Sequence, residues 1–478
     1  MELLAQAEAR RKSSQPEHEN SRGIQLGQFF TPVAVAELLA ELPRIPEDNY
    51  INILDPGAGT GILAAALINR LLSEKPSLHI RLVAVEVDES LLPVLRETLS
   101  DCEHLGVKTT LFTDDFIQWA LSTPERFDLV IQNPPYSKIR SGSESDRVLK
   151  SAGIRVPNTY AGFMALGIGL LKNGGQQVSI TPRSWMNGTY YAPFRHAFLK
   201  RAGIDAIHIF ESRSSLFEDT GVLQETVIVS ATKEHRPEHV RVLISDSQHD
   251  KAKERMVPYT DVATSDFIHI PATQHDTDTV RWMADFKDTL DTLGLSVSTG
   301  KVVDFRSREL LHNDQIPDSV PMVYPANFLN GNIEHPRDSV HKPQWFKVDA
   351  QIAHKYLVPD GTYTLIKRFS AKEEKRRVVS AVWSGTGPVA FDNKTNYIHC
   401  NGHGLNPVLA RGLCMWFNST RLDDYFRVFS GHTQVNAGDL RQMKLPSLSQ
   451  LIALGKSHSS PDAAVEKVIT MRRTAKPV

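Results

Sequence analysis

Short apolar runs alternate with longer amphipathic stretches through the first half of the chain. Ile51-Asn52-Ile53-Leu54 has the apolar character of a buried strand, and residues 62–72 behind it repeat their apolar positions with the period of a helix. Strands separated by helices predict an α/β fold built on a doubly wound sheet of mostly parallel strands. Further strands are predicted at residues 80–85, 109–112, 127–131, 177–181, 206–210 and 226–230, and further helices at 90–99 and 161–172.

The regular alternation stops near residue 245. The chain of 478 residues exceeds the usual size of a single core, so two domains are expected. Residues 246–289 are polar and poorly periodic, which predicts a linker with some helix. The predicted division is a flexible segment at 1–20, an α/β domain at 21–245, the linker at 246–289, a second domain at 290–455 and a helical tail at 456–478.

The two halves of the chain differ in net charge, although the whole chain is nearly neutral. The whole chain has a net charge of −1. Residues 290–478 hold 24 basic and 17 acidic side chains, a net charge of +7, whereas the remaining residues hold 30 and 38, a net charge of −8. A basic second half predicts that contacts with nucleic-acid phosphates come from that half. The alternative is a solvated surface that binds nothing.

Other chemistry is restricted by the cysteines, the histidines and the N-terminus. Cys102, Cys400 and Cys414 fit neither a disulfide framework nor a zinc-binding spacing, and the eighteen histidines form no metal-ligand pattern, so no metal is expected. The first 20 residues are polar and charged, unlike a signal peptide, and no apolar run is long enough to cross a bilayer. A cytoplasmic protein without a membrane partner is expected.

A glycine-rich turn follows the first predicted strand, with the sequence Asp55-Pro56-Gly57-Ala58-Gly59-Thr60-Gly61. Glycines allow a tight turn and a close backbone approach, so that amide groups and a helix N-terminus can face the carboxylate of a cofactor. A glycine loop alone is a weak signal, because dinucleotide-binding proteins also use one. The G-x-G-x-G spacing after an aspartate resembles the loop of S-adenosylmethionine-dependent enzymes more than that of NAD enzymes. The predicted cofactor-binding residues of this loop are Asp55, Gly57, Ala58, Gly59 and Gly61.

Acidic residues also stand at the ends of the next two strands. Glu86 ends the second strand and is placed to accept hydrogen bonds from both hydroxyls of a ribose. Asp115 and Phe116 follow the third strand, where the carboxylate can accept from an adenine amine while the ring covers an adenine face. The alternative is that Asp115 caps a helix, a role for which Asp114 is equally suited.

The fourth predicted strand ends at Asn133-Pro134-Pro135-Tyr136. Two consecutive prolines fix φ and remove two donors, so the carbonyls before and between them are rigid and point outward. The side-chain oxygen of Asn133 and the carbonyl of Pro134 can each accept one N–H of an exocyclic amine, whose lone pair then turns toward the methyl group of a sulfonium. Because that methyl group is already activated, positioning and electrostatics replace a nucleophile or strong base.

Tyr136 offers a flat surface on which the target base can stack. The four residues Asn133, Pro134, Pro135 and Tyr136 are therefore the predicted catalytic centre. The alternative is a structural Pro-Pro turn with a buried tyrosine.

Taken together, these motifs resemble the gamma class of DNA adenine-N6 methyltransferases of bacterial restriction–modification systems, of the PstI/BsuBI and TaqI methylase type. Gly27-Gln28-Phe29-Phe30-Thr31-Pro32 matches the N-terminal motif of that class, and Asp55–Gly61, Glu86, Asp115-Phe116 and Asn133–Tyr136 follow in the same order. Pro182-Arg183-Ser184-Trp185 and Leu223-Gln224-Glu225-Thr226 are further matches, and the resemblance covers roughly residues 20–235.

The resemblance implies a Rossmann-like, S-adenosylmethionine-dependent methyltransferase domain at 21–245. It also places Phe30, Thr31 and Pro32 beside the cofactor. A phenylalanine before the last strand is implied to sandwich the flipped adenine against Tyr136. Phe217 is the best-placed candidate, and Phe210 is expected to be a core residue.

A second resemblance lies downstream, to the target-recognition domain of PstI-like methylases. The matching segments are 298–306, 323–325, 393–396 and 430–436, and they imply a DNA-binding domain of mixed α/β character. Chemically, Lys301, Arg306, Lys394 and Arg441 suit phosphates, while Asn396, Gln434 and Asn436 suit base edges. The run 372–377 is also basic, although an exposed helix face is the alternative there, and His432 is expected in a turn or at a phosphate.

Rival functions make different demands on the sequence. The N-P-P-Y motif also occurs in methyltransferases of a release-factor glutamine and of RNA adenine, and cytosine-N4 enzymes mostly carry Ser in place of Asn133. A non-catalytic scaffold is expected to lose Asn133, Tyr136 or the glycine loop, all of which are intact. The expected function is site-specific adenine-N6 methylation of double-stranded DNA by a monomer, as an orphan methylase or with a separately encoded restriction endonuclease.

Overall fold

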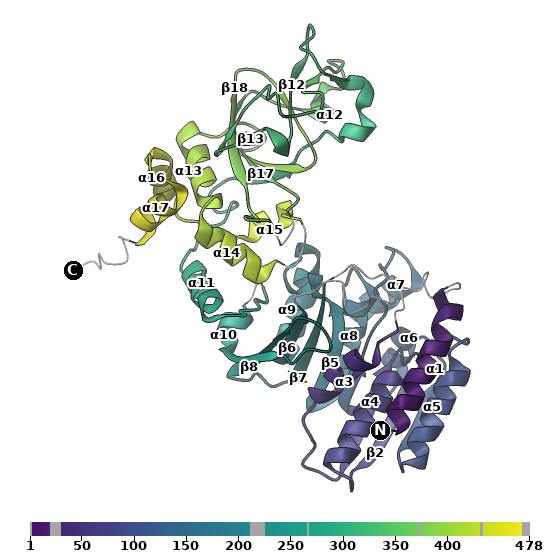
Figure 1. Ribbon diagram of the computed structural model, residues 1–478. Helices are drawn as coiled ribbons and strands as arrows, with labels where there is room; N and C mark the ends of the chain where they lie inside the picture. Colours follow the sequence, from purple (N-terminus) through teal and green to yellow (C-terminus); the bar gives the residue numbers. More distant parts are fainter. Residues whose placement is uncertain are drawn as a thin grey trace, which may run out of the picture. The chain divides into compact units, whose positions relative to one another are not determined.

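The computed structural model describes residues 2–19, 30–210, 225–264, 267–370, 374–430 and 434–470. The chain forms two compact units, Met1–Ala272 and Thr273–Val478 (Figure 1). The boundary falls inside the segment 246–289, for which the sequence predicts a linker.

Unit 1 is built on a nine-stranded sheet with the order β3-β2-β1-β4-β5-β7-β6-β8-β9. All seven strands predicted from the apolar pattern lie within its first seven strands, so the α/β fold is confirmed. The strands are β1 (Tyr50–Pro56), β2 (His79–Val85), β3 (Lys108–Phe112), β4 (Phe127–Gln132), β5 (Leu171–Pro182), β6 (Ala202–Phe210), β7 (Thr226–Lys233), β8 (His239–Ser245) and β9 (Lys253–Pro258).

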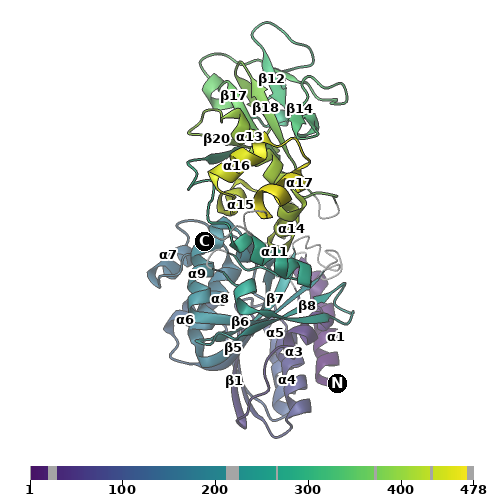
Figure 2. The ribbon, with the colours of Figure 1, turned by 90° about the vertical axis from the view of Figure 1, so that its left-hand side faces the viewer.

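Helices cover both faces of this sheet (Figures 1 and 2). Two buried apolar clusters, one on each face, explain this layering, because successive side chains of a strand point to opposite faces. One face carries α1 (Glu2–Glu19), α3 (Val33–Glu41), α4 (Ile62–Glu74) and α5 (Leu92–His104). The other carries α6 (Phe116–Ser122), α7 (Glu144–Ser151), α8 (Thr159–Leu170) and α9 (Ala192–Arg201).

The first segment of the chain differs from the flexible stretch that the sequence predicts for residues 1–20. Residues 2–19 form helix α1, whose side chains Leu3, Leu4 and Ala7 are buried in the apolar cluster with α4 and α5. Arg10 also pairs with Glu97 (3.0 Å) and Asp101 (2.7 Å) of α5. The helix is therefore held by packing as well as by charge, and neither contact is visible in a local sequence pattern.

Strand order sets the position of the site. The chain runs outward from β1 to β2 and β3, then returns to β4 on the other side of β1. β1 pairs in parallel with both β2 and β4, so the loops that follow β1 and β4 leave the same edge of the sheet at the point where the order reverses. Ligands bind at this switch point in doubly wound sheets.

The far side of the sheet is partly antiparallel. β7 runs antiparallel to both β5 and β6, between which it lies. β8 pairs in parallel with β6, and β9 pairs antiparallel with β8 at the sheet edge. β9 and helix α10 (Tyr259–Val262) fall within 246–289, so this part of the predicted linker belongs to the sheet of unit 1.

Unit 2 has a mixed architecture of two sheets and several helices. A six-stranded sheet has the order β10-β20-β17-β18-β14-β13, and a five-stranded sheet has the order β11-β15-β12-β19-β16. The strands are β10 (Ser296–Thr299), β11 (Leu311–His312), β12 (Val320–Val323), β13 (Phe328–Leu329), β14 (Asn332–Ile333), β15 (Trp345–Phe346), β16 (Leu357–Val358), β17 (Gly361–Lys367), β18 (Ser380–Gly385), β19 (Val389–Phe391) and β20 (Thr395–His399).

The α-helices of unit 2 are α11 (Gln274–Ala284), α12 (Ala353–Tyr356), α13 (Pro407–Phe417), α14 (Thr420–Phe429), α15 (Ala437–Gln442), α16 (Leu448–Lys456) and α17 (Pro461–Val465), which a π-helical turn extends to Thr470. Helix α11 packs on α14 and so belongs to this unit, although the predicted linker reaches residue 289.

Two glycines allow α13 and α16 to pack closely. A Cβ added at Gly412 would lie 1.9 Å from the carbonyl oxygen of Leu451, and one at Gly455 would lie 1.9 Å from that of Val408. Each glycine therefore lies directly against the backbone of the facing helix. This contact attaches the C-terminal helices to the rest of unit 2.

Candidate active site

Asn133 lies directly beyond the end of β4 and meets Thr31, which precedes the start of helix α3 by two residues. Its side-chain Nδ2 donates a hydrogen bond to Thr31 Oγ1 at 3.0 Å. The preceding residue, Gln132, donates from Nε2 to Ser179 Oγ of β5 at 2.9 Å, which fixes the end of the strand. Two motifs that are far apart in the sequence thus meet at the edge of the sheet, with Thr31 buried beside Asn133.

The proline pair that follows ends in a buried tyrosine. Tyr136 is 9% exposed, and burial raises the pKa of its hydroxyl above the usual value, so the ring stays neutral. Its ring meets the ring of Tyr160 edge to face at 6.1 Å, and Tyr160 in turn stacks on Tyr191 at 5.8 Å. Sequence reasoning missed Tyr160 and Tyr191, since no local pattern links a helix start near 160 to a loop near 191.

The glycine loop adopts backbone angles that favour glycine. Gly57, Gly59 and Gly61 have φ values of 70°, 57° and 83°. The amides of Gly57 and Ala58 both donate to the carbonyl of Val85 at the end of β2, at 2.8 and 3.1 Å. A Cβ at Gly61 would also lie 2.9 Å from the Thr98 side chain. The loop is therefore fixed against the neighbouring strand, and helix α4 begins directly behind it.

Two buried carboxylates lie beside this loop. Asp55 is fully buried, and among the described residues no side chain donates a hydrogen bond to its carboxylate. Burial, together with the nearby Glu86, raises the pKa of Asp55 to about 8. The backbone of Ala64 acts in the opposite direction and lowers the pKa. Burial also raises the pKa of Glu86.

The carboxylate of Glu86 is held in place by backbone amides. Its Oε2 accepts from the amide of Gly59 and its Oε1 from the amide of Asp88, both at 2.8 Å. The carboxylate still has acceptor capacity for a ligand hydroxyl. Neither Asp55 nor Glu86 forms an ion pair within the described ranges, so a ligand that carries positive charge and hydroxyl groups fits this part of the site.

Asp115 and Phe116 have different environments. Asp115 is exposed and caps α6, with its Oδ1 accepting from the amides of Ile117 (2.9 Å) and Gln118 (3.2 Å). The helix-cap role is therefore present, and contact with an adenine amine stays a prediction. Phe116 is buried against Phe163 of α8, with ring centroids 4.6 Å apart.

Phe163 was missed by sequence reasoning. Its ring borders the glycine loop, because a Cβ added at Gly57 would lie 3.4 Å from the ring carbon Cε1. The residue sits in an apolar helical run that predicts only burial, so its place beside the loop appears only in the fold.

Some predicted residues lie outside the described residues. These are Phe217, Gly27–Phe29, Leu223-Gln224 and His432. Phe210 is a buried residue of β6 whose ring stacks on that of His208 at 4.6 Å, in agreement with its expected place in the core.

The motif after β5 meets the motif before β7. The amide of Arg183 donates to the carbonyl of Glu225 at 2.8 Å, and the guanidinium Nη1 of Arg183 lies 3.9 Å from Glu225 Oε2. Trp185 is fully buried and donates from Nε1 to Thr181 Oγ1 at 3.1 Å. These two motifs therefore support the edge of the sheet beside Asn133.

In unit 2, several predicted DNA-binding residues already have partners within the unit. Asn396 is fully buried: its Nδ2 donates to the carbonyl of Val435 (2.7 Å) and its Oδ1 accepts from Thr299 Oγ1 (3.0 Å). This differs from the expected contact with a base edge, because the amide is used inside the fold. Lys301 donates from Nζ to the carbonyls of His354 (3.1 Å) and Leu357 (2.8 Å).

The remaining predicted residues are closer to solvent. Gln434 is half-buried and accepts from Arg368 Nη2 at 3.4 Å, and Asn436 caps α15. Arg441 is exposed, although its Nη2 donates to the carbonyl of Val297 at 3.0 Å. Arg306 lies over the ring of Phe305, which is 60% exposed.

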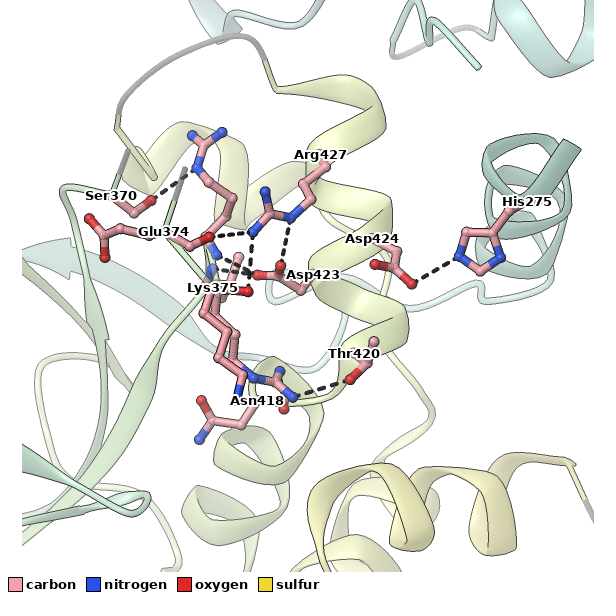
Figure 3. A network of polar contacts seen from close by, with 12 residues as sticks. His275, Ser370, Glu374, Lys375, Asn418, Thr420, Asp423, Asp424 and Arg427 are labelled. Atoms are coloured by element: carbon pink, nitrogen blue, oxygen red, sulfur yellow. Dashed lines mark hydrogen bonds and ion pairs between the residues drawn. The ribbon is translucent and has the colours of Figure 1, made fainter. Parts of the chain in front are cut away.

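The described part of the basic run 372–377 contains no helix, which corrects the expected alternative of an exposed helix face there. Its described part, 374–377, forms an irregular connection before β18 in which Arg377 is 1% exposed. Asp423 of α14 accepts from the backbone amides of Arg377 (2.7 Å) and Val378 (2.8 Å) and from Arg427 Nε (2.9 Å) (Figure 3). A buried carboxylate therefore holds this connection, which explains why the charges are not presented on a helix face.

The described parts of the chain contain neither a metal-binding cluster nor a membrane-spanning helix. There, no group of three or more His, Cys, Asp or Glu side chains is arranged to hold a metal ion. In the same ranges, no helix has both the length and the apolar character needed to cross a bilayer.

Known proteins that are similar to this chain include restriction–modification methylases. Residues 80–217 match the family model of the Eco57I restriction-modification methylase. The Type II methyltransferase M.BsuBI of Bacillus subtilis is 39% identical over 456 residues, which cover 90% of each chain. The Type II methyltransferase M.PstI of Providencia stuartii is 36% identical over 452 residues, covering 89% of this chain and 88% of that protein.

Among solved structures, the Type IIL restriction-modification enzyme MmeI, determined in complex with DNA, shares the fold. It has a TM-score of 0.55 at 13% identity, and the match covers 99% of this chain and 69% of that one. The chain is an S-adenosylmethionine-dependent methyltransferase. It belongs to the family of Type II methyltransferases that includes M.BsuBI and M.PstI.

Proposed function

We propose that this Type II methyltransferase transfers a methyl group from S-adenosylmethionine to the N6 amine of an adenine in double-stranded DNA. The observation that carries the proposal is the position of Asn133. It lies at the end of β4, at the switch point of the sheet, and its amide is oriented by the hydrogen bond from Nδ2 to Thr31 Oγ1 at 3.0 Å. With Nδ2 engaged, Oδ1 is the group that can accept from a substrate amine.

The reaction depends on positioning. Asn133 Oδ1 and the carbonyl of Pro134 each accept one N–H of the adenine amine, which directs the nitrogen lone pair toward the methyl donor. The adenine leaves the helical stack at a cost of a few kcal/mol. It stacks on Tyr136, whose buried, neutral ring is backed by Tyr160. Phe217 is the candidate for the opposite face of the base.

The cofactor is assigned to the residues around the glycine loop. When bound, S-adenosylmethionine supplies a methyl group already activated by a sulfonium. A positively charged ligand favours the ionised forms of Asp55 and Glu86, whose pKa values are raised by burial, and Glu86 is assigned to the ribose hydroxyls. The glycine loop Gly57–Gly61, the segment Phe30–Pro32, and Asp115 with Phe116 complete the proposed site.

Duplex DNA is favoured over RNA by how far the relatives match. The two Type II methyltransferases match about nine-tenths of this chain, including unit 2. The tRNA adenine-N6 methyltransferases match only 91 residues, 19% of the chain. Unit 2, where the net positive charge lies, is therefore assigned to target recognition, with the exposed Arg306 and Arg441 as phosphate contacts and Gln434 and Asn436 at base edges.

The biological context follows from the same relatives. The protein acts as the modification component of a Type II restriction–modification system or as an orphan methylase. In the first case a separately encoded endonuclease cleaves the same DNA site. The enzyme works as a monomer.

The decisive experiment measures methyl transfer from radiolabelled S-adenosylmethionine to plasmid DNA. Wild-type protein is expected to label DNA, and Asn133→Ala to bind the cofactor without labelling. Label found on RNA or protein, and never on DNA, would overturn the proposal. Single-molecule sequencing of DNA from cells that express the protein then identifies the methylated base and its sequence context.

A second experiment tests the assignment of Glu86. Glu86→Ala is expected to weaken cofactor binding, measured by calorimetry, while the Kd for DNA measured without cofactor stays the same. Equal losses in both affinities would show that Glu86 supports the fold instead of holding the ribose.

A further inference from the structure

Tyr190 is the most exposed large aromatic or aliphatic side chain among the described residues, at 87%. It lies in the short 3-10 turn Thr189–Tyr191, between β5 and α9. β5 runs parallel to β4, so this turn follows the same edge of the sheet as Asn133–Tyr136. An aromatic ring left in water at this edge gains hydrophobic stabilisation only when a ligand covers it.

The connection that carries Tyr190 is firmly held. Arg195 of α9 is fully buried and donates from Nη1 to the carbonyls of Trp185 (2.9 Å) and Gly188 (3.2 Å). The neighbouring Tyr191 donates from its hydroxyl to Asn158 Oδ1 at 2.9 Å. Tyr190 is thus presented by a fixed backbone, which lowers the entropic cost of binding through its ring.

A chain of rings connects this turn to the catalytic tetrapeptide. Tyr191 stacks on Tyr160 at 5.8 Å with an angle of 27° between the rings, and Tyr160 meets Tyr136 at 6.1 Å. Tyr160 also exchanges a hydrogen bond with Ser184, its hydroxyl lying 2.9 Å from Ser184 Oγ. Tyr190 therefore directly precedes Tyr191 in the chain, and the ring of Tyr191 is linked to that of Tyr136 through Tyr160.

Positive charge lies on the connection that follows the tetrapeptide, between β4 and α7. Lys138 and Arg140 come directly after the tetrapeptide, are exposed, and form no ion pair within the described ranges. The backbone of Lys138 pairs with that of Asn158, the residue that accepts from Tyr191. Residues 137–156 hold five basic and two acidic side chains, although the chain outside 290–478 is acidic.

We propose that Tyr190, Lys138 and Arg140 form a DNA contact within unit 1, separate from target recognition by unit 2. The two cations bind phosphates beside the target nucleotide, and the Tyr190 ring stacks on a base of the duplex that is distorted when the adenine leaves its stack. This inference rests on the proposed function. It also assigns DNA contacts to the acidic half of the chain, where net charge alone predicts none.

The stacking part is tested with Tyr190→Ala, Tyr190→Phe and the control Tyr50→Ala. Tyr50 is also exposed, at 51%, but it begins β1 at the opposite edge of the same sheet. Tyr190→Ala is expected to raise the KM for plasmid DNA by about 10-fold, as loss of one base–aromatic stack does, with no change in the Kd for S-adenosylmethionine. Tyr190→Phe and Tyr50→Ala are expected to match wild type.

The charge part is tested with the double variant Lys138→Ala/Arg140→Ala. Binding to a labelled duplex cut from a methylated plasmid is measured against salt concentration. The slope of log K against log salt is expected to fall in magnitude by about 2, because each phosphate contact contributes about 0.9. The control is Lys108→Ala/Arg126→Ala. Both residues are exposed, at the start of β3 and directly before β4, and so lie at the edge of the sheet opposite to Asn133. The salt slope of this variant is expected to match that of wild type.

The outcomes separate this inference from the proposed function. If wild type methylates DNA but Tyr190→Ala behaves like Tyr50→Ala, and the Lys138/Arg140 variant keeps the wild-type slope, the contact does not exist. If wild type does not methylate DNA at all, the proposed function itself has failed.

Discussion

The side chain of Asn133 is oriented by Thr31, a residue 102 positions earlier in the chain, through a hydrogen bond of 3.0 Å from Nδ2 to Oγ1. The N-terminal motif therefore acts on the proposed catalytic asparagine. An amide that is held by its nitrogen presents its oxygen in a fixed direction.

Thr31→Val is expected to lower kcat for methyl transfer by roughly 5-fold, because it removes one hydrogen bond worth about 1 kcal/mol and lets the amide of Asn133 rotate. The rate is measured with labelled S-adenosylmethionine at saturating DNA and cofactor. Thr31→Ser keeps the hydroxyl and is the matched control. If valine and serine variants turn over at the same rate, the hydrogen bond does not orient Asn133.

Asp55 makes the stability of the cofactor-free protein depend on pH. Its pKa is raised to about 8 in the folded protein from an unfolded value near 3.8, so the folded state binds a proton that the unfolded state has lost. The contribution of this proton to the free energy of unfolding is greatest below pH 4. It is lost as the pH rises toward 8. Between pH 6 and pH 9, Asp55→Asn is therefore expected to gain on the order of 2 kcal/mol relative to wild type. Calorimetric unfolding of both proteins at the two pH values measures the difference, and parallel curves would contradict the shift.

Asp423 is expected to be essential for the stability of unit 2. It is 4% exposed and accepts from two backbone amides and from Arg427 Nε, so Asp423→Ala leaves buried donors without partners and costs about 3 kcal/mol (Figure 3). Asp424, the next residue of the same helix, pairs with the exposed His275 at 3.0 Å.

Asp424→Ala is accordingly the matched control and is expected to cost less than about 1 kcal/mol. Urea unfolding of the two variants gives the comparison. Equal losses of stability would mean that the backbone contacts of Asp423 contribute little.

Because α13 and α16 pack closely, adding a single methyl group between them is expected to lower the stability of the protein. Gly455→Ala places a Cβ 1.9 Å from a backbone oxygen, so the helices must separate, and a loss of about 3 kcal/mol or more is expected. Gly169, in helix α8, has open space where its Cβ would stand, so Gly169→Ala is expected to be neutral or stabilising by up to about 1 kcal/mol. Thermal unfolding compares the two variants, and a tolerated alanine at 455 would show that this helix contact is not close.

The amino-acid sequence by itself determined seven of the nine strands of unit 1, the glycine loop and the motif Asn133–Tyr136. These features depend on short-range properties: apolar periodicity, the φ freedom of glycine and the rigidity of proline. Parallel strand order then brings the ends of β1, β2 and β4 to one edge, and for this reason the strand pattern is enough to group Asp55, Glu86 and Asn133 in one site.

The tertiary structure alone decided which side chains meet across long separations. The contact of Thr31 with Asn133, the rings of Tyr160 and Tyr191 behind Tyr136, and the burial of Asn396 leave no trace in local patterns. A polar or basic residue has the same local signature whether it faces DNA or bonds inside the fold. Burial and hydrogen-bond partners separate these cases, and both are set by the packing of elements that are distant in the chain.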